Sequence, residues 1–443
     1  MLVKICLALG LLACAPAWCQ TQANDAEANK ASEDDSQLQV PPPVSGQAYA
    51  TTFEGENESN YLRGGVTFTG AYSSNVSYGA TPVGDMSYSI WPTIALDKTT
   101  YRMHLVLDYA PGFTLYQRMS SLNQADQSLA VNLQYRLSPN LTATLAEGFQ
   151  KTTNFFNQPN PLSATPVTGS VPVSNIAVIP PLAEMISNTT TSQLSYQMSA
   201  DSMIGAGGSY TTLTYPNPAQ VEGVFNSRSA GGSFFYSTRF REKNYIGASY
   251  QYGNYLSFQS NSPSTGTQTQ TIFLFFTMFL KPNLSLSVSG GPQHYSSTQA
   301  SSPSVAAWQP MTVVSMGWQG QRTTLAASYA RTVSGGGGLN GTFHTNAAST
   351  SFSWQINRDW TAALSGSYSN YKNLTPFFLF STPGGHMLSG SASLQRQINP
   401  HTNFQLGYSW AQQSYLRTSG SSYPDLNRVF VTVSFTFAKP LQR

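Results

Sequence analysis

The chain has 443 residues, of which 9% are charged and 12% are aromatic, with 35 glycines. This composition excludes an intrinsically disordered protein, because disorder needs high net charge and few large apolar groups. No uninterrupted apolar run of about 18 residues follows the N-terminal segment, so the usual length argument excludes membrane-spanning helices.

Residues 1–19 are the first predicted element. Lys4 gives a basic start, an apolar run follows from Ile5 to Ala13, and the small residues Ala17 and Cys19 come just before Gln20. This order is typical of a secretory signal peptide. We therefore expect an exported protein that is cleaved near Gln20.

All three cysteines, Cys6, Cys14 and Cys19, lie in this N-terminal segment. A chain cleaved before Gln20 would hold no thiol, so we expect neither disulfides nor thiolate metal sites. The stretch ending in Cys14 also loosely resembles a lipoprotein box, in which Cys14 would be lipidated. Leu12 fits that alternative poorly.

Residues 20–60 are polar and acidic, with eight carboxylates against Lys30 and three consecutive prolines from Pro41 to Pro43. Such a segment cannot bury enough apolar surface to fold alone, so we predict a disordered periplasmic linker. The alternative is a small plug or a peptidoglycan contact. Residues 61–443 hold 20 basic against 11 acidic residues, a net charge of +9, which suits anionic solutes and phosphate-rich lipopolysaccharide.

From Arg63 onward, apolar residues alternate with small polar residues, which is the period of a β-strand. The pattern predicts eighteen strands joined by eight short and nine longer connections, among them 152–187, 260–267, 298–306 and 334–342. A regular exchange of short turns and long loops is typical of a membrane barrel with both termini on the periplasmic side. We therefore predict an all-β, transmembrane, antiparallel up-and-down barrel over residues 61–443, because closure leaves no unpaired edge in lipid.

The apolar parity of the strands predicts the face that meets lipid. The clearest members are Met86, Tyr88, Ile90, Ile94, Leu96, Met103, Leu105, Leu107, Tyr109, Leu129, Val131, Leu133, Tyr135, Leu194, Tyr196, Met198, Ile272, Leu274, Phe276, Met278 and Leu280. Three positions fit this pattern of regular strands with an apolar outer face less well. Pro92 predicts a β-bulge, Pro111-Gly112 predicts a kink or an end in the third strand, and Glu147 is a charge on the lipid parity that belongs near the external interface.

The last strand, Val429 to Phe437, has five apolar residues on one parity and, except for Phe430, polar residues on the other. A terminal strand of this kind after repeated hairpins resembles the closing strand of Gram-negative outer-membrane β-barrels of the porin type. Ala438 to Arg443 depart from the usual ending, because they follow the terminal aromatic residue. The resemblance implies an outer-membrane location, insertion by the barrel assembly machinery, and contact with outer-membrane lipids and lipopolysaccharide.

Motifs for catalysis are missing from the sequence. The chain has no Gly-x-Ser-x-Gly elbow, no phosphate-binding loop and no paired-histidine metal spacing, and its five histidines are scattered. We therefore expect no enzyme, no cofactor, no metal and no nucleic-acid partner.

Ionisable residues on the inward parity are the first candidates for lining a pore. Arg102, His104 and Asp108 share the inward face of the third predicted strand, and Arg239 has the same parity further along. They could set an ion preference, which the net charge would make weakly anionic. The alternative is that these groups are paired inside the wall.

The second candidate set is aromatic. Phe273, Phe275 and Phe279 have inward parity on a strand that is apolar on both faces, so something apolar must pack on its inner side. We predict that the loop 152–187, rich in Val, Ile and Leu, folds into the lumen and packs there. The rival is an aromatic slide for sugars, as in maltoporin-like channels, which also have eighteen strands.

These patterns favour a porin-like channel for passive diffusion of small hydrophilic solutes, with the pore narrowed by the loop 152–187. The alternative is a non-conducting structural or export-associated barrel with a filled lumen. The sequence names neither the solute nor the oligomeric state.

Overall fold

The structure is a computed structural model that describes residues 60–76, 82–153, 184–217, 224–241, 244–259, 262–281, 283–299, 302–335, 338–374, 384–415 and 425–441. Strands dominate this part of the chain, and its one helix is the short 3-10 turn η2 (Ser120–Leu122). No helix in these ranges has the length and apolar character needed to cross a membrane.

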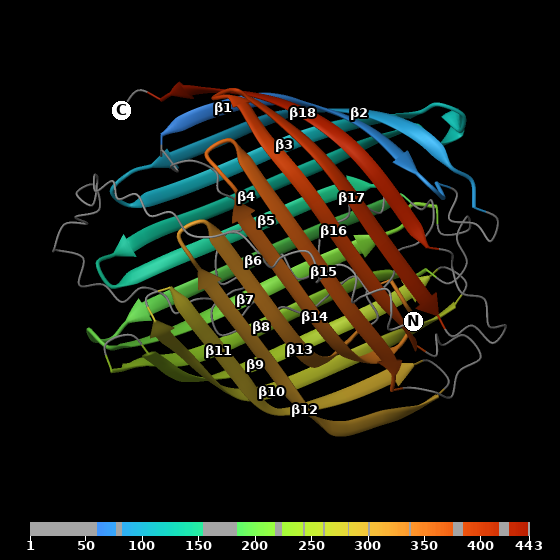
Figure 1. Ribbon diagram of the computed structural model, residues 1–443. Coiled ribbons are helices and arrows are strands. Elements are labelled where there is room, and N and C mark those ends of the chain that lie inside the picture. The colour runs from blue at the N-terminus through green and yellow to red at the C-terminus, as the bar shows by residue number, and fades with distance from the viewer. Residues whose placement is uncertain are drawn as a thin grey trace, which may run out of the picture. The chain divides into compact units, whose positions relative to one another are not determined.

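Eighteen strands form one antiparallel sheet in which each strand pairs with its neighbours in the chain (Figure 1). They are β1 (Tyr61–Ser73), β2 (Asp85–Thr99), β3 (Met103–Tyr116), β4 (Gln124–Ser138), β5 (Leu141–Thr152), β6 (Met185–Gln197), β7 (Ser202–Thr214), β8 (Asn226–Phe240), β9 (Asn244–Gln259), β10 (Ser262–Lys281), β11 (Leu284–Gln299), β12 (Ser302–Gln319), β13 (Thr323–Gly335), β14 (Thr342–Gln355), β15 (Trp360–Asn373), β16 (Gly384–Asn399), β17 (Thr402–Tyr415) and β18 (Leu426–Pro440). β1 also pairs with β18, from Tyr61 opposite Pro440 to Ser73 opposite Arg428, and this pairing closes the barrel. The predicted fold class and strand number are confirmed, while the periplasmic position of the termini stays a prediction.

The two faces of the wall separate as the sequence parity predicts. On β10, Leu274 is 66% exposed on the outer face, whereas its neighbour Phe275 is 2% exposed on the inner face. The outer apolar residues of β18 are likewise exposed, and the inner hydroxyls of Thr67 and Ser434 share a hydrogen bond of 3.0 Å across the closure. The barrel therefore has an apolar outer band and a polar inner wall.

Two connections predicted as long loops are strands in the structure, apart from residues 260–261 and 300–301, which lie outside the described residues. β9 ends at Gln259 and β10 begins at Ser262, while β11 ends at Gln299 and β12 begins at Ser302. The predictions of loops at 260–267 and 298–306 were wrong because polar character was taken for irregular structure. Threonine is a β-branched residue that favours strands, and Thr265 and Thr267 bury their side chains on the inner face of β10.

Glycines and aromatic rings face each other across neighbouring strands. Phe275 lies directly opposite Gly247, and a Cβ on that glycine would be 2.3 Å from the ring. Phe430 lies in the same way opposite Gly407, at 2.1 Å. Phe430 was the apolar exception on the inner parity of the last strand, and the bare backbone of Gly407 gives its ring a place against the wall.

Two prolines interrupt the pairing of β2 with β3 without shifting its register. Pairing between β2 and β3 stops after Ile90 opposite Phe113 and resumes at Ile94 opposite Tyr109 in the same register, which places Pro92 opposite Pro111. Neither proline has an N–H to give to the ladder, so the hydrogen bonds are lost there. The predicted bulge at Pro92 is wrong because the register is unchanged. The third strand does not end at Pro111, because β3 continues to Tyr116, while the alternative of a kink there stays a prediction.

Glu147 has the predicted outward parity and is stabilised there by its neighbours. The side-chain amide of Asn188 donates to Glu147 Oε1 at 2.5 Å, and the hydroxyl of Thr190 donates to the other carboxylate oxygen. Both donors lie on the outer face of β6, opposite or next to Glu147 in the register. A charge on the outer wall is therefore compensated by two donors rather than by a counter-ion.

We predict that Leu274→Arg lowers the yield of inserted barrel strongly, whereas Ser195→Arg on the inner face of β6 does not. An arginine on the lipid face costs about 2 to 4 kcal/mol near the middle of the bilayer, while an inner-wall substitution stays in a polar environment. The measurement is the fraction of heat-modifiable protein after folding into vesicles. Equal yields of the two variants would refute the assignment of the faces.

Candidate functional site: a hairpin folded into the barrel

The upper part of the β13–β14 hairpin leaves the wall. β12 and β13 pair from Gln319 opposite Thr324 up to Thr312 opposite Arg331. β13 and β14 continue to pair with each other beyond this point, as far as Gly335 opposite Thr342. Along the residues that the structure describes, the upper half of β12 thus pairs with β11 alone, and the hairpin end is free to bend away.

Pro310 explains why the two strands separate at this position. It lies opposite Pro292 in the β11–β12 register, and two prolines can face each other only where neither N–H is needed for that pair. The nitrogen of Pro310 therefore points toward β13, where continued register would place Val333. Because proline has no N–H to donate, the ladder cannot continue there.

Gln293 of β11 replaces the partner that β13 has lost. Its side-chain carbonyl accepts from the backbone N–H of Val333 at 2.8 Å, and its side-chain amide donates to the backbone C=O of Val333 at 3.1 Å. Gln293 has inward parity and is buried. A single amide side chain on the inner wall thus satisfies both backbone groups of the departing strand.

Further polar contacts hold the hairpin end across the inner wall. Thr342 shares a hydrogen bond of 2.6 Å with Thr267 of β10 and donates to Ser297 of β11 at 2.7 Å. Thr265 of β10 donates to the side-chain carbonyl of Asn340 at 2.6 Å. The hydroxyls that β10 and β11 turn inward are therefore used to bind the hairpin.

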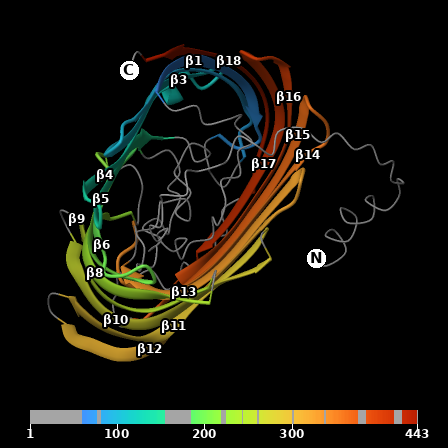
Figure 2. The same ribbon diagram turned by 90° about the vertical axis from the view of Figure 1, so that its left-hand side faces the viewer.

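The tip of the hairpin reaches the strands β7 and β8. The backbone N–H of Phe225 donates to the C=O of Gly338 at 2.9 Å. A Cβ on Gly338 would be 2.8 Å from the hydroxyl oxygen of Tyr215, which packs in a buried cluster with Met185, Leu213 and Val224. Figure 2, a view into the barrel, shows β13 inside the arc formed by β10, β11 and β12.

Both faces of the hairpin end are buried, which distinguishes it from the wall. Val333 has outward parity but is only 1% exposed, because this face of β13 lies against the inner side of β11. Phe343 is fully buried and packs with Leu339 and Tyr371 in a separate buried cluster. We call the described residues of this end of the hairpin, 332–335 and 338–345, the lumen hairpin.

Glycine makes the close approach of the lumen hairpin possible. A Cβ on Gly335 would be 2.5 Å from the Cβ of Tyr255 on β9, so any larger residue would push the hairpin off the wall. Gly338 and Gly341 have φ values of 100° and 138°, a region that L side chains rarely adopt. The glycine-rich tip is therefore required both by the contact and by the turn.

The predicted aromatic set has a different partner from the one expected. Phe273 and Phe275 form a buried cluster with Met311 and Val313 of β12, which lies two strands away. Phe279 is half-buried and lies outside that cluster. Small residues on β11 between the two strands leave the space that these side chains share, so the apolar partner of the phenylalanines is the wall itself.

The loop that we expected to pack on Phe273 and Phe275 cannot be placed, because residues 154–183 lie outside the described residues. Thr152 is the last residue of β5, and β6 begins at Met185, so residues 185–187 of the predicted loop are strand. The inward element that the structure describes is instead the hairpin that includes 334–342, a segment predicted as an external loop.

The predicted ionisable set on the third strand is only partly assembled. Arg102 lies in the turn before β3 rather than on the strand, with its guanidinium carbon 5.3 Å from the ring centre of Tyr101. His104 and Asp108 have inward parity on β3 and are exposed there. His104 lies 3.5 Å from a carboxylate oxygen of Asp97, so its nearest charged neighbour comes from β2.

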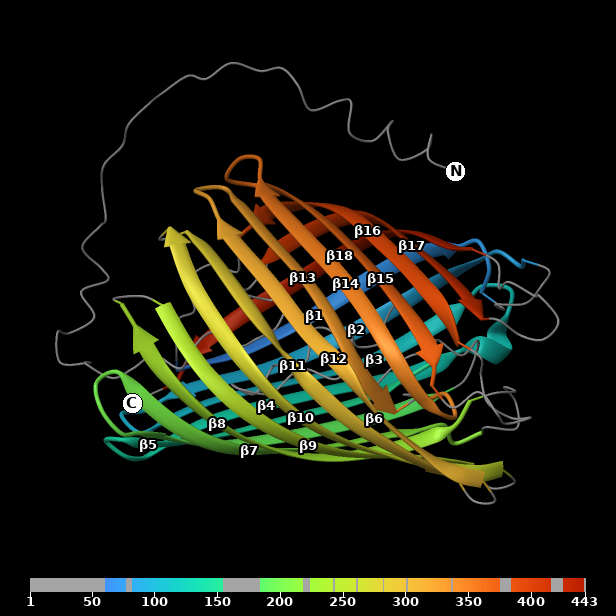
Figure 3. The ribbon, with the colours of Figure 1, turned by 90° about the horizontal axis from the view of Figure 1, so that it is seen from below.

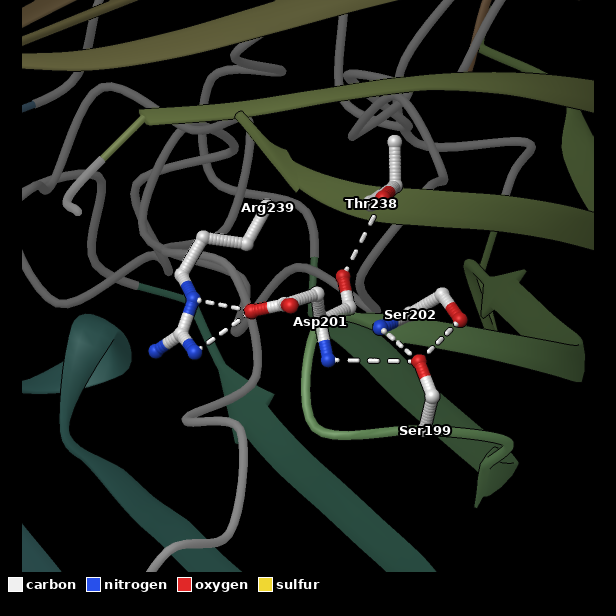
Figure 4. Close-up of polar contacts among 5 residues, drawn as sticks. All are labelled: Ser199, Asp201, Ser202, Thr238 and Arg239. Carbon is white, nitrogen blue, oxygen red and sulfur yellow. Dashed lines mark hydrogen bonds and ion pairs between the residues drawn. The ribbon is translucent and has the colours of Figure 1, made fainter. Parts of the chain in front are cut away.

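Arg239 is held at a turn rather than free in the lumen. Its guanidinium donates to Asp201 Oδ1 through Nε at 2.8 Å and through Nη2 at 2.5 Å (Figure 4). Asp201 belongs to the turn between β6 and β7, where Ser199 accepts from two backbone N–H groups. The charge of Arg239 is thus balanced locally by Asp201, and its role in ion preference stays a prediction.

The described part of the chain holds no group of three or more His, Cys, Asp or Glu residues that could bind a metal. Hydroxyl and amide side chains dominate the contacts of the lumen hairpin instead. Such an arrangement offers hydrogen-bonding groups to a polar solute. The sequence signals that could have found it are Pro310 and the glycine-rich run that ends at Gly341.

No protein-family model matches the chain, and no curated sequence does. Among solved structures, OccK2 (OpdF) of Pseudomonas aeruginosa is similar over 86% of this chain and 98% of its own, with 12% identity and a TM-score of 0.42. The outer membrane protein OpdK of the same organism covers 85% and 99%, with 12% identity and a TM-score of 0.40. The ferric citrate transporter FecA covers 86% and 79%, with 10% identity and a TM-score of 0.44. These likenesses concern the barrel fold alone.

We predict that Gln293→Leu loosens the lumen hairpin while the barrel still closes. The substitution leaves the buried N–H and C=O of Val333 unsatisfied, which costs about 1 to 3 kcal/mol for each group. Amide hydrogen exchange should become faster at Val333 and in the hairpin tip. The control is Gln405→Leu, a half-buried inner residue of β17, which should leave the hairpin unchanged; equal protection in both variants would contradict the role of Gln293.

Proposed function

We propose that the protein is an outer-membrane, porin-like channel that passes small hydrophilic solutes by passive diffusion, and that the lumen hairpin forms its constriction. The observation that carries the proposal is the contrast between two sides of the inner wall. The hydroxyls of β10 and β11 are buried under the hairpin, whereas Asp108, Asn132, Gln134 and Ser365 on β3, β4 and β15 stay exposed on the inner face. An exposed polar wall opposite a buried one is what a narrowed aqueous passage needs.

The apolar outer band of the barrel supports an outer-membrane location. A ring of exposed apolar residues with few charges suits a hydrocarbon environment. The sheet closes through β1 and β18, and most of its backbone groups are paired between neighbouring strands, an exception being the upper part of β12 that β13 has left. Under this proposal the signal peptide 1–19 directs export, the barrel assembly machinery inserts the strands, and the loop 152–187 is a second predicted part of the constriction. The chain has no enzymatic role in this proposal.

A second candidate is a non-conducting structural or export-associated barrel. The observation that favours it is the burial of both faces of the lumen hairpin, which shows that part of the lumen is filled. The two candidates differ in whether an aqueous path remains along the exposed inner face of β3 and β4. A recording of current through single molecules separates them.

We predict that replacing residues 336–341 by Asn-Gly raises the single-channel conductance. Gly335 and Thr342 pair directly, so a two-residue turn can join them. The variant loses the hydrogen bonds that Gly338, Leu339 and Asn340 make with Phe225, Ser257 and Thr265. The measurement is single-channel recording in planar bilayers. No current from either the native chain or the variant would contradict the channel, and an equal conductance would contradict the constriction.

A cysteine pair provides the matched control. The hydroxyl oxygens of Thr267 and Thr342 are 2.6 Å apart, so Thr267→Cys/Thr342→Cys places two thiols within reach of each other, and any signal-peptide cysteines are removed on cleavage. Oxidation of this pair should keep the conductance at the native level. A large drop on oxidation would show that the hairpin leaves this position in the conducting state.

A further inference from the structure

The outer face of β13 to β16 carries basic residues above its apolar band. Arg331, Asn346, Asn370 and His386 lie directly opposite one another on successive strands, which run side by side in Figure 3. In the next row toward the hairpin end, His344 lies opposite Lys372. We call Arg331, Lys372 and His386 the outer basic patch, and His344 is buried beside it.

The patch follows a fixed order of side chains along these strands. Leu325, Phe352 and Leu364 form an apolar row on the outer face, directly opposite one another. Tyr329 and Tyr368 come four residues further up their strands and are both exposed. The basic residues begin two positions beyond Tyr329. Along these strands, apolar residues are followed by tyrosines and then by cations. This order matches that of the acyl chains, the interface and the headgroups in a bilayer leaflet.

The basic side chains of the patch have no counter-ion in the described part of the barrel. Arg331 donates through Nε to Nε2 of His344 at 2.8 Å, and Tyr329 donates to the side-chain carbonyl of Asn346 at 3.1 Å. The ion pairs of the described residues lie elsewhere, at Lys151 with Glu184, Arg239 with Asp201 and His104 with Asp97. The remaining donors of Arg331 and the ammonium of Lys372 are thus left without a carboxylate.

This arrangement is unfavourable for the isolated protein. Arg331 and Lys372 are like charges on adjacent rows, connected through His344, and no ion pair within the described residues reduces their repulsion. A bound anion with several oxygens would remove the repulsion and use the fork of donors that arginine presents. The apolar and tyrosine rows below add a surface for acyl chains.

From this juxtaposition we infer that the outer basic patch binds the phosphate groups of a phosphorylated glycolipid of the outer leaflet, of the lipid A type, whose acyl chains lie on Leu325, Phe352 and Leu364. The inference rests on the outer-membrane location in the proposed function. It does not depend on whether the barrel conducts. The amphipathic lipid is favoured over free phosphate because the cations stand directly above an exposed apolar surface.

The test measures lipid binding to the purified full chain in detergent by native mass spectrometry. The probes are bisphosphorylated lipid A, lipid A from which both phosphates have been removed, and inorganic phosphate. Bisphosphorylated lipid A should bind the native chain at least about tenfold more tightly than either other probe, as charge-assisted hydrogen bonds predict. Equal binding of the dephosphorylated lipid would overturn the inference, and equal binding of inorganic phosphate would reduce the patch to an anion site.

Two variants and one control connect the binding to the patch. Arg331→Gln/Lys372→Gln should lose at least about tenfold in affinity for bisphosphorylated lipid A, and Arg331→Lys should retain part of it. The control is Arg396→Gln, which removes an outward-facing arginine at the other end of β16, where its guanidinium carbon is 5.4 Å from the ring centre of Trp360. Equal losses in the control and the double variant would overturn the inference.

Folding and function are checked separately. Each variant must show the same heat-modifiable band as the native chain, so that weak binding is not a result of unfolding. If bisphosphorylated lipid A does not bind preferentially but the channel current is normal, the lipid-binding role of the patch alone is overturned. Lipid binding without any current would overturn the channel alone.

Discussion

The requirement that every backbone N–H and C=O finds a partner governs this structure. A strand in lipid has no water to bond with, so the sheet must close, and the pairing of β1 with β18 closes it. Wherever a ladder is interrupted, something must compensate or the defect must be short. At Pro92 and Pro111 the interruption is short and the register resumes. At Pro310 it is not, and the consequence is a hairpin that leaves the wall.

The lumen hairpin shows how a barrel obtains an internal element without an inserted domain. A missing N–H at Pro310 releases β13 from β12, and Gln293 supplies a substitute pair of hydrogen bonds two strands away. Threonine and serine hydroxyls on β10 and β11 then complete the contact. The inner wall of β9 to β11 is thus specialised to hold the hairpin, while the opposite inner wall remains exposed. This division carries the proposed channel function.

Much of the fold was predictable, because a period of two fixes which side chains face outward over long stretches. The strand number, the closure and the outer residues such as Leu274 followed from that period. The inward element was not predictable. It depends on the direction in which Pro310 points its nitrogen, which requires the register of β11 and β12. Threonine-rich strand ends were mistaken for loops because their burial under the hairpin is a tertiary effect. Arg239 was expected to line a pore because its counter-ion, Asp201, comes from a distant turn.

The departure of β13 has a consequence for the strand it leaves behind. Within the described residues, β12 continues past Thr312 with one side of its backbone not paired to β13. Such an edge is a template on which a strand of another molecule can pair and begin aggregation. Pro310 interrupts this edge, because it has no N–H to donate there. The same residue type that releases the hairpin therefore also protects the vacated strand from pairing with a second molecule.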